Sequence, residues 1–186
     1  MRHRSSTSAG SSCESRFSAA YDAAYADVLR YVQRRVTTGA EDVVAEAMTV
    51  AWRRVEELPE SLDDARAWMF GIAHHCMLNH HRARRRQEAL GVRLATAGSA
   101  TPDEPDGSAL AISRLDLARA WALLEPAEQE VIALTALDGL TSEHAGRVLD
   151  ITATAYRHRL SRARAALRRH LDGAAATAPI REEITS

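Results

Sequence analysis

The chain has 186 residues, which is enough for one medium domain or for two small ones. Apolar residues make up 46% of it and aromatic residues only 5%, and its richness in Ala, Leu, Arg and Glu favours helices over strands. The formal net charge is −1 and every one of the 24 basic residues is Arg, so any signal for nucleic acid must be local rather than global.

The two cysteines, Cys13 and Cys76, are too few for a disulfide framework. Ser5–Glu14 is polar where a secretory signal would need an apolar run, and no stretch approaches the length of a membrane span. We therefore expect a protein of the reducing cytoplasm that does not insert into a membrane.

The first half of the chain predicts a helical bundle. Residues 1–14 are rich in Ser, Thr and Gly and predict a disordered tail. Three apolar stripes with helical spacing follow, beginning at Phe17, Val44 and Ala65, and they are separated by breaks at Gly39 and Pro59. Three amphipathic helices that must each bury one face predict a compact domain over residues 15–88.

Residues 89–113 predict a flexible linker, because Gly, Pro, Ser and acidic residues replace the helical pattern there. Its extended reach of roughly 80 Å would let two domains sit more than one helical turn of DNA apart. Helical periodicity returns over residues 114–172, and residues 173–186 predict a loose tail. The expected fold class is all-α, with two small helical domains joined by a flexible linker.

The strongest functional pattern lies near the C-terminus. A short helix over Thr141–Leu149, a break, and a longer Arg-rich helix over Thr154–Leu171 have the order of a helix-turn-helix. Between Arg157 and Leu171 the helix carries six Arg and no acidic residue. These arginines repel one another unless an anion lies against them, which favours DNA contact over a solvated face. Short polar and guanidinium groups near the helix start suit base edges and flanking phosphates: Thr154, Arg157, His158, Ser161, Arg162 and Arg164.

A second basic face ends the third predicted helix. Its members recur at steps of four, three and four and so share one face: His75, Asn79, Arg82 and Arg86, broadened by Arg84 and Arg85. Such a stripe can lie along a phosphate backbone, although a basic helix end also complements the helix dipole. The acids Glu41, Asp42 and Glu46 at the start of the second helix have two interpretations in the same way, as dipole complements or as part of a protein-docking face.

Five segments in order resemble the extracytoplasmic-function sigma factors of bacterial RNA polymerase. The segments are Ala40–Met48, Ala65–Ala73, His80–Arg86, Leu124–Val131 and Arg157–Arg164. Any one of them is a weak signal, whereas five in the family's order, with a linker between the third and fourth, are strong. The resemblance covers residues 15–88 and 114–171, with Asp150 standing where the family often has Gly in the turn.

The resemblance implies a role for each domain. The first would bind core RNA polymerase, with Asp42, Val43 and Glu46 on the clamp helices of the β′ subunit. The β subunit is a further expected partner. The same domain would also open and hold the −10 promoter element with the loop 58–64 and with the next helix, through Trp68, His75, Asn79, Arg82, Arg85 and Arg86. The second would recognise the −35 element with the six residues named above from Thr154 to Arg164. An anti-sigma factor is a further implied partner; no catalytic residue, cofactor or metal is implied.

Two other functions fit parts of the sequence. A DNA-binding regulator that ignores polymerase explains residues 114–171 equally well but leaves the first domain unexplained. A metal sensor could use His74, His75, Cys76, His80 and His81. Consecutive helix positions fan out by about 100° per residue, so the first three of these cannot face one ion. Cys76 lies on the apolar stripe, which predicts a core position.

Overall fold

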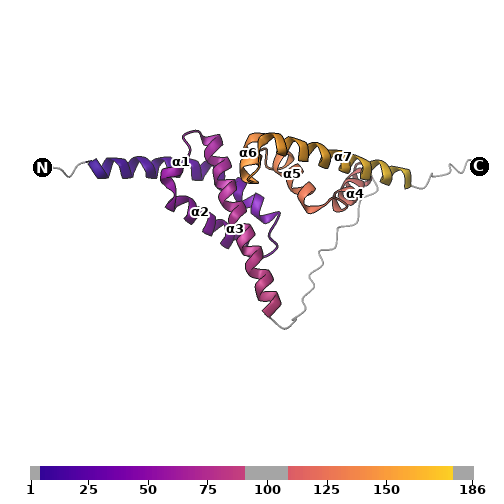
Figure 1. Cartoon of the computed structure of the whole chain (residues 1–186), viewed down its shortest axis with the longest axis horizontal. Coiled ribbons are helices and arrows are strands. Elements are labelled where there is room, and N and C mark those ends of the chain that lie inside the picture. Colours follow the sequence, from indigo (N-terminus) through magenta and orange to yellow (C-terminus); the bar gives the residue numbers. More distant parts are fainter. Residues whose placement is uncertain (1–4, 91–108, 178–186) are drawn as a thin grey trace, which may run out of the picture.

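The computed structural model describes residues 5–90 and 109–177, and every regular element in these two ranges is a helix (Figure 1). The N-terminal domain holds α1 (Ser5–Gln33), α2 (Ala40–Arg53), the short 3-10 helix η1 (Val55–Glu57) and α3 (Leu62–Leu90). The C-terminal domain holds α4 (Ala109–Ala122), α5 (Pro126–Ala136), α6 (Ser142–Val148) and α7 (Ala153–Thr177). The all-α, two-domain prediction is confirmed.

Local chemistry explains the N-terminal helix boundaries. Gly39 has φ of +78°, a left-handed conformation that costs Gly little and lets the chain turn from α1 into α2. Glu41 and Asp42 then lie in the first turn of α2, where they complement the helix dipole. Ser61 caps α3 by accepting a hydrogen bond from the backbone N–H of Asp64 at 3.1 Å. The three helices pack on one another through their apolar faces.

The C-terminal helices are also set by their caps. Pro126 begins α5, and Glu125 and Glu128 form a reciprocal capping box around that start. The predicted cap of α6 is confirmed, since the Thr141 hydroxyl accepts from the N–H of His144 at 3.2 Å. The helix-turn-helix is confirmed as α6 and α7, which are joined by a short turn.

Three boundaries differ from the sequence prediction. The helix α1 begins at Ser5, inside the segment expected to be disordered, because only Gly10 interrupts a run of residues that can continue a helix. The ends of the predicted linker are helical, since α3 reaches Leu90 and α4 begins at Ala109. Likewise α7 continues into the predicted tail as far as Thr177. The rest of the linker and of the tail, residues 91–108 and 178–186, lies outside the described residues.

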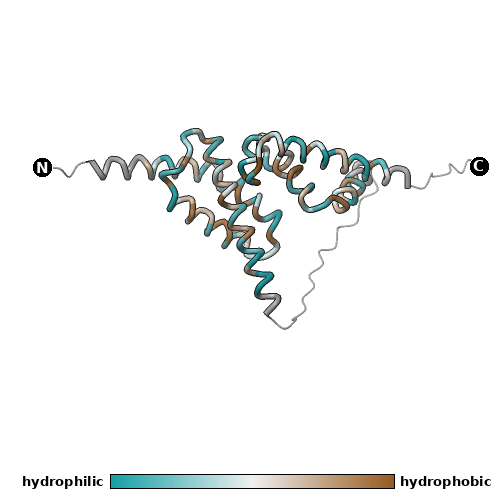
Figure 2. The backbone as a smooth tube through the Cα atoms, in the orientation of Figure 1, coloured by the Kyte–Doolittle hydropathy of each residue, from teal (hydrophilic) through white to brown (hydrophobic). Residues whose placement is uncertain are grey.

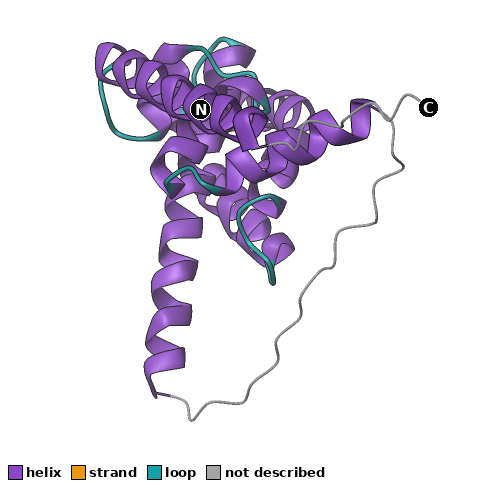
Figure 3. Cartoon of the chain, turned by 90° about the vertical axis from the view of Figure 1, so that its right-hand side faces the viewer, coloured by secondary structure: helices purple, strands orange, loops and turns teal. Residues whose placement is uncertain are grey.

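The two domains pack on each other. One cluster of buried apolar residues extends from α1, α2 and α3 into α5, α6 and α7, and α6 lies directly against α3 (Figure 1). The C-terminal part of α3 leaves this body and projects alone, as the turned view in Figure 3 shows. It is hydrophilic along most of its projecting length (Figure 2). None of the described helices is apolar over a stretch long enough to cross a bilayer.

Candidate nucleic-acid interface

The outer face of α7 carries the residues predicted to contact the −35 element. At 100° per residue, Thr154, Arg157, His158 and Ser161 lie within an arc of about 100°, and all four are exposed. Arg162 and Arg164 are exposed on either side of that arc. The Arg157 guanidinium donates to the Thr154 hydroxyl at 3.0 Å, so these two side chains already lie together. The structure thus brings all six predicted residues to one surface of one helix.

The inner face of α7 is anchored by Tyr156, which the apolar periodicity of the helix places on the buried face, although its hydrogen bonds carry no sequence signal. Its ring is fully buried, and its hydroxyl donates to the backbone carbonyl of Val131 on α5 at 2.6 Å. The same oxygen lies 2.7 Å from the hydroxyl of Thr135, one turn further along α5. Since a phenol has a single proton, Thr135 is the donor in this second bond. Tyr156 therefore holds the recognition helix on α5 from within the core.

The turn between α6 and α7 depends on two residues. A Cβ added to Gly146 would lie 2.8 Å from the backbone oxygen of Ile151, closer than real Cβ atoms come. Asp150 has φ of +53° and is the sole non-glycine residue with positive φ in the described part of the chain. A left-handed residue at this point explains why the related family often has Gly there, and Asp is among the side chains that tolerate it.

The predicted −10 face runs along α3. Trp68, His75, Asn79, Arg82 and Arg86 lie within an arc of about 60° that extends roughly 27 Å along the helix, with Arg85 to one side. All of them are exposed except Trp68, which is half-buried with the Arg54 guanidinium 5.8 Å from its ring. The structure therefore forms the predicted stripe but divides it in two. Trp68 and His75 lie on the part of α3 that faces α6, whereas Asn79 to Arg86 lie beyond it, with Arg84 bonded to Thr38 of the α1–α2 loop.

The predicted polymerase-docking residues do not all reach the surface. Asp42 and Glu46 are exposed and one helical turn apart on the outer face of α2. Val43 is only 2% exposed because it points into the core between α1 and α3, so a direct contact from its side chain is corrected to a packing role. Any docking face on α2 must therefore consist of Asp42, Glu46 and their exposed neighbours.

The histidine and cysteine cluster of α3 is dispersed. The ring of His74 lies 3.0 Å from the Tyr31 hydroxyl, and burial lowers the pKa of His74. His75 faces Asp150 at 3.5 Å. Cys76 is a core residue, as predicted, and burial raises the pKa of its thiol to about 11. No three His, Cys, Asp or Glu side chains within residues 5–90 and 109–177 lie close enough to share a metal ion.

Charged residues join the two domains around Asp138. The Asp138 carboxylate is buried and accepts from Arg34 and, at 3.2 Å, from Arg35, which directly follow α1. Burial raises the pKa of this carboxyl, and the two guanidinium groups act against that rise. Arg35 also donates to Glu130 of α5 at 2.7 Å. Arg66 of α3 donates to the backbone oxygen of Asp138 at 2.6 Å.

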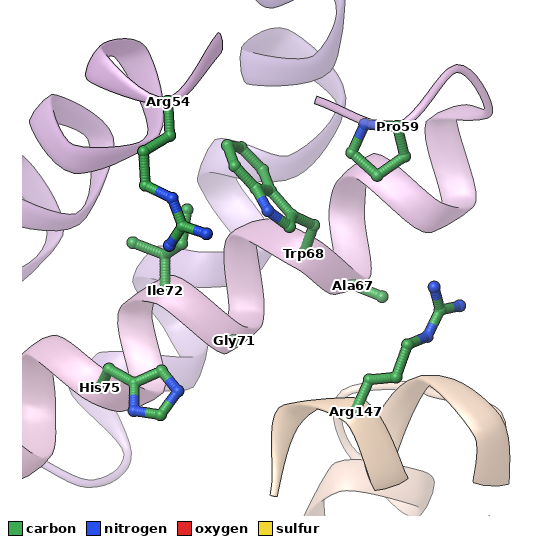
Figure 4. Close-up of a pocket in the computed structure, with 8 residues that line it drawn as sticks. All are labelled: Arg54, Pro59, Ala67, Trp68, Gly71, Ile72, His75 and Arg147. Atoms are coloured by element: carbon green, nitrogen blue, oxygen red, sulfur yellow. The ribbon is translucent and has the colours of Figure 1, made fainter. Parts of the chain in front are cut away.

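A second charged contact joins the domains where α6 meets α3. Arg147 donates to the carboxylate of Asp64 at 2.5 Å, and the His144 ring lies 3.2 Å from the same oxygen. Hydrogen bonds from Ser61 and then Arg147 lower the pKa of Asp64 to about 2. Beside this contact lies a cleft of about 200 Å³, into which Arg147 of α6 extends toward Ala67 and Trp68 of α3 (Figure 4).

These interdomain residues carry no distinctive sequence pattern. Asp138 precedes Gly139 and therefore indicates only a turn, and Arg34 with Arg35 indicates only a basic helix end. Their partners lie about a hundred positions away, beyond the reach of any periodicity. A buried carboxylate without a local partner would have indicated a partner in another domain. A single sequence, however, does not show that a turn residue is buried.

Two family profiles match this chain. Residues 20–87 match Sigma-70 region 2, and residues 114–167 match Sigma-70, region 4. The first match ends on the projecting part of α3, and the second spans the helix-turn-helix. Together they cover the two helical domains and leave out the segment between them.

Curated proteins and solved structures show the same likeness. The RNA polymerase sigma factor CnrH of Cupriavidus metallidurans is 34% identical over 73% of this chain and 74% of its own length. The ECF RNA polymerase sigma factor SigL of Mycobacterium tuberculosis is 32% identical over 81% of this chain and 85% of its own. The structure of CnrH in complex with the cytosolic domain of CnrY superposes with a TM-score of 0.55 at 25% identity, covering 84% of this chain and 88% of that one.

Proposed function

Because this chain belongs to the extracytoplasmic-function sigma factors, which direct RNA polymerase to promoters, we propose that its two domains recognise the two promoter elements separately. The helix α7 contacts the −35 element in the major groove. The helix α3 holds the opened −10 element, and α2 docks on the polymerase. The chain itself carries out no covalent chemistry, and it acts in the cytoplasm, where the polymerase works.

The observation that supports this proposal most is the two-sided character of α7. Tyr156 and the neighbouring buried residues clamp one side of the helix, so the other side must present Thr154, Arg157, His158 and Ser161 outward. A recognition helix contacts base edges with its N-terminal residues, and the arc lies in the first three turns of α7. Arg164 lies further along and is suited to a flanking phosphate.

On the N-terminal side, an outward carboxylate pair and a basic stripe support the other two contacts. Asp42 and Glu46 give α2 an acidic docking surface for a basic polymerase helix. The projecting part of α3 gives Asn79, Arg82 and Arg86 to a single strand, where phosphate contact and stacking offset the cost of unpairing bases. A regulator that ignores polymerase would leave these surfaces, and the region 2 match, without a use.

We also propose an anti-sigma factor as a partner. CnrH, a relative with which this chain shares its fold, was solved with the cytosolic domain of CnrY. A protein that covers the α2 or α3 surface would keep this chain from polymerase or from DNA. The proposal is tested by the co-purification of a second protein with the full-length chain from its own cells, before and after the α2 surface is altered.

The decisive experiment separates base contact from phosphate contact on α7. Arg157→Ala should cost about 1–3 kcal/mol of binding on the preferred −35 element and should relax its sequence choice. Arg164→Ala should weaken binding to all sequences about equally and reduce the slope of log K against log salt by about one unit. Binding of the reconstituted holoenzyme to matched and scrambled elements over a salt series measures both.

The matched control is Arg119→Ala, which removes an exposed arginine from α4 that pairs with Asp116 on the same helix. It should leave both affinity and salt slope unchanged. If neither α7 variant differs from this control, α7 is not the recognition helix and the proposed division of labour is wrong.

A further inference from the structure

Leu58 is the residue at which the chain leaves the core of the N-terminal domain and enters the loop before α3. Its side chain is buried, and its N–H donates to the carbonyl of Val55 at 3.1 Å. Pro59 follows, so the backbone of Leu58 is extended, with φ of −61° and ψ of 121°. Its carbonyl accepts from the guanidinium of Arg16 on α1 at 2.7 Å. The side chain, the N–H and the carbonyl of Leu58 are therefore all held in place.

The far end of this loop is fixed by nearby residues. The Ser61 hydroxyl accepts from the N–H of Asp64 at 3.1 Å and donates to its carboxylate at 2.6 Å. The Ser61 carbonyl accepts from the N–H of Ala65 at 2.9 Å, which begins the helix. These partners are three or four residues apart, whereas Arg16 and Leu58 are 42 residues apart. The start of the loop is thus the end that a single distant substitution can release.

Arg16 lies on a part of α1 that precedes the family match, which begins at residue 20. The ring of its neighbour Phe17 meets Trp52 of α2 edge-on, with 5.0 Å between the ring centroids, and η1 packs on α1. These contacts hold this part of α1 beside the loop. A guanidinium is always charged, and a charged donor makes a stronger hydrogen bond than a neutral one. The chain therefore supports its loop with a residue outside the matched family region.

The exposed side chains of the loop are two acids and one leucine: Glu60, Asp63 and Leu62. Carboxylates repel a phosphate backbone, so they do not suit phosphate contacts. A carboxylate can instead accept from a base edge, such as the amino group of cytosine, and an apolar side chain can contact an unstacked base. Hydrogen bonds to base edges weaken steeply with misalignment. The direction in which the loop leaves Leu58 therefore decides what its tip can recognise.

We propose that Arg16 is a positioning residue for recognition of the −10 element. It fixes the start of the 58–64 loop, and with it the direction in which the acidic tip meets unpaired bases. This role rests on the proposed function of the N-terminal domain, whereas the support of the loop does not. Arg16 acts through Leu58 and needs no contact with DNA. Its loss should weaken the choice of −10 sequence and leave binding to core polymerase intact.

The first measurement follows the loop in the full-length chain by hydrogen exchange. The peptide that covers residues 55–65 contains the bonded amides of Leu58 and Asp64. Arg16→Ala should speed exchange in this peptide about three- to tenfold, the range that one lost hydrogen bond represents. Arg16→Lys should retain most of the protection, because an ammonium can donate to the same carbonyl. Arg30→Ala is the matched control, since it removes an exposed arginine of α1 whose partner Asp27 lies three residues away.

The second measurement determines the −10 preference of the reconstituted holoenzyme. Duplex fragments carry the preferred −35 element and a randomised −10 element, and the fragments that form open complexes are sequenced. The parent protein should enrich a defined −10 sequence. Arg16→Ala should lower this enrichment about three- to tenfold, whereas Arg16→Lys and Arg30→Ala should stay close to the parent. Co-purification with core polymerase checks that docking is unchanged in each variant.

Each outcome decides a different step. Unchanged loop exchange in Arg16→Ala, with circular dichroism showing a folded protein, would overturn the support of the loop. Faster exchange with an unchanged −10 profile would overturn the positioning role alone. A parent protein that enriches no −10 sequence would sink the proposed −10 function, and the positioning role with it.

Discussion

The anchoring of the recognition helix by Tyr156 gives a prediction with a calculable size. The substitution Tyr156→Phe keeps the buried ring and removes only the hydroxyl, which donates to Val131 and accepts from Thr135. Burial raises the pKa of Tyr156, so the phenol remains protonated and able to donate throughout the neutral range. The change therefore isolates the hydrogen bonds from the apolar packing.

The magnitude follows from what the freed groups can do next. A neutral hydrogen bond contributes about 0.5–1.5 kcal/mol net, and two are lost. The Thr135 hydroxyl can instead donate to the Val131 carbonyl, four residues back in its own helix, so one of the two losses is largely recovered. We expect the free energy of unfolding to fall by about 1–2 kcal/mol. Thr135→Val in the same protein should add little to this loss, because the two hydroxyls serve one network.

Urea unfolding followed by circular dichroism measures the change, and a thermal scan reports the size of the unit that unfolds. Each kcal/mol lowers Tm by about 4–8 °C for a domain of 60–100 residues but by about 2–4 °C for one of 150–250. The smaller shift would mean that the two packed domains unfold as one body. A loss under about 0.3 kcal/mol, or a Thr135→Val effect that simply adds to it, would refute the hydrogen-bond argument.

The remaining predictions concern surfaces and turns. Changing Asp42 and Glu46 together to Arg should abolish co-purification with core polymerase without loss of helicity, and undiminished binding would exclude α2 as the docking face. Asp150→Gly should raise the free energy of unfolding by about 0.5–1 kcal/mol, because Gly adopts the left-handed conformation without strain, whereas Asp150→Ala should lower it. Urea titration measures both changes. The pKa of Asp64 is lowered to about 2, so this carboxyl stabilises the folded protein above about pH 4 and ceases to do so as the pH falls toward 2. The urea midpoints of the parent and of Asp64→Asn should therefore differ at pH 7 and converge as the pH falls from about 4 to 2; a gap that is constant with pH would count against the ion pair.

The sequence was sufficient for the helices and their order because the decisive signals are local. Gly39, Pro126 and Thr141 mark helix starts through backbone conformation or capping. Each of these helices begins in the structure where the sequence predicts it. The outward arc of α7 also follows from periodicity alone, once Tyr156 and Leu160 are assigned to the core. Fold class and the candidate DNA-binding face could therefore be predicted from the amino-acid pattern alone.

What could not be predicted depends on contacts between distant segments. Asp42 and Val43 are consecutive residues of α2 and lie about 100° apart around its axis, so the way the helix rests on α1 and α3 decides which of them is buried. The sequence around Asp138 is that of a solvated turn, yet the residue is buried like a core residue, because the other domain supplies its partners. Flexible linker composition allows domains to be apart, but it does not show whether their surfaces attract each other.

The turn at Gly146 has a consequence for how this protein can change its promoter. The angle between α6 and α7 depends on the absence of one methyl group, since a Cβ there would collide with the Ile151 oxygen. The side chains on the outer arc of α7 take no part in that contact. The residues that choose a DNA sequence can thus be exchanged while the frame that aims them stays the same. A library that varies Thr154, Arg157, His158 and Ser161 but keeps Gly146 should yield folded proteins with new preferences, whereas one that varies Gly146 should yield misdirected ones.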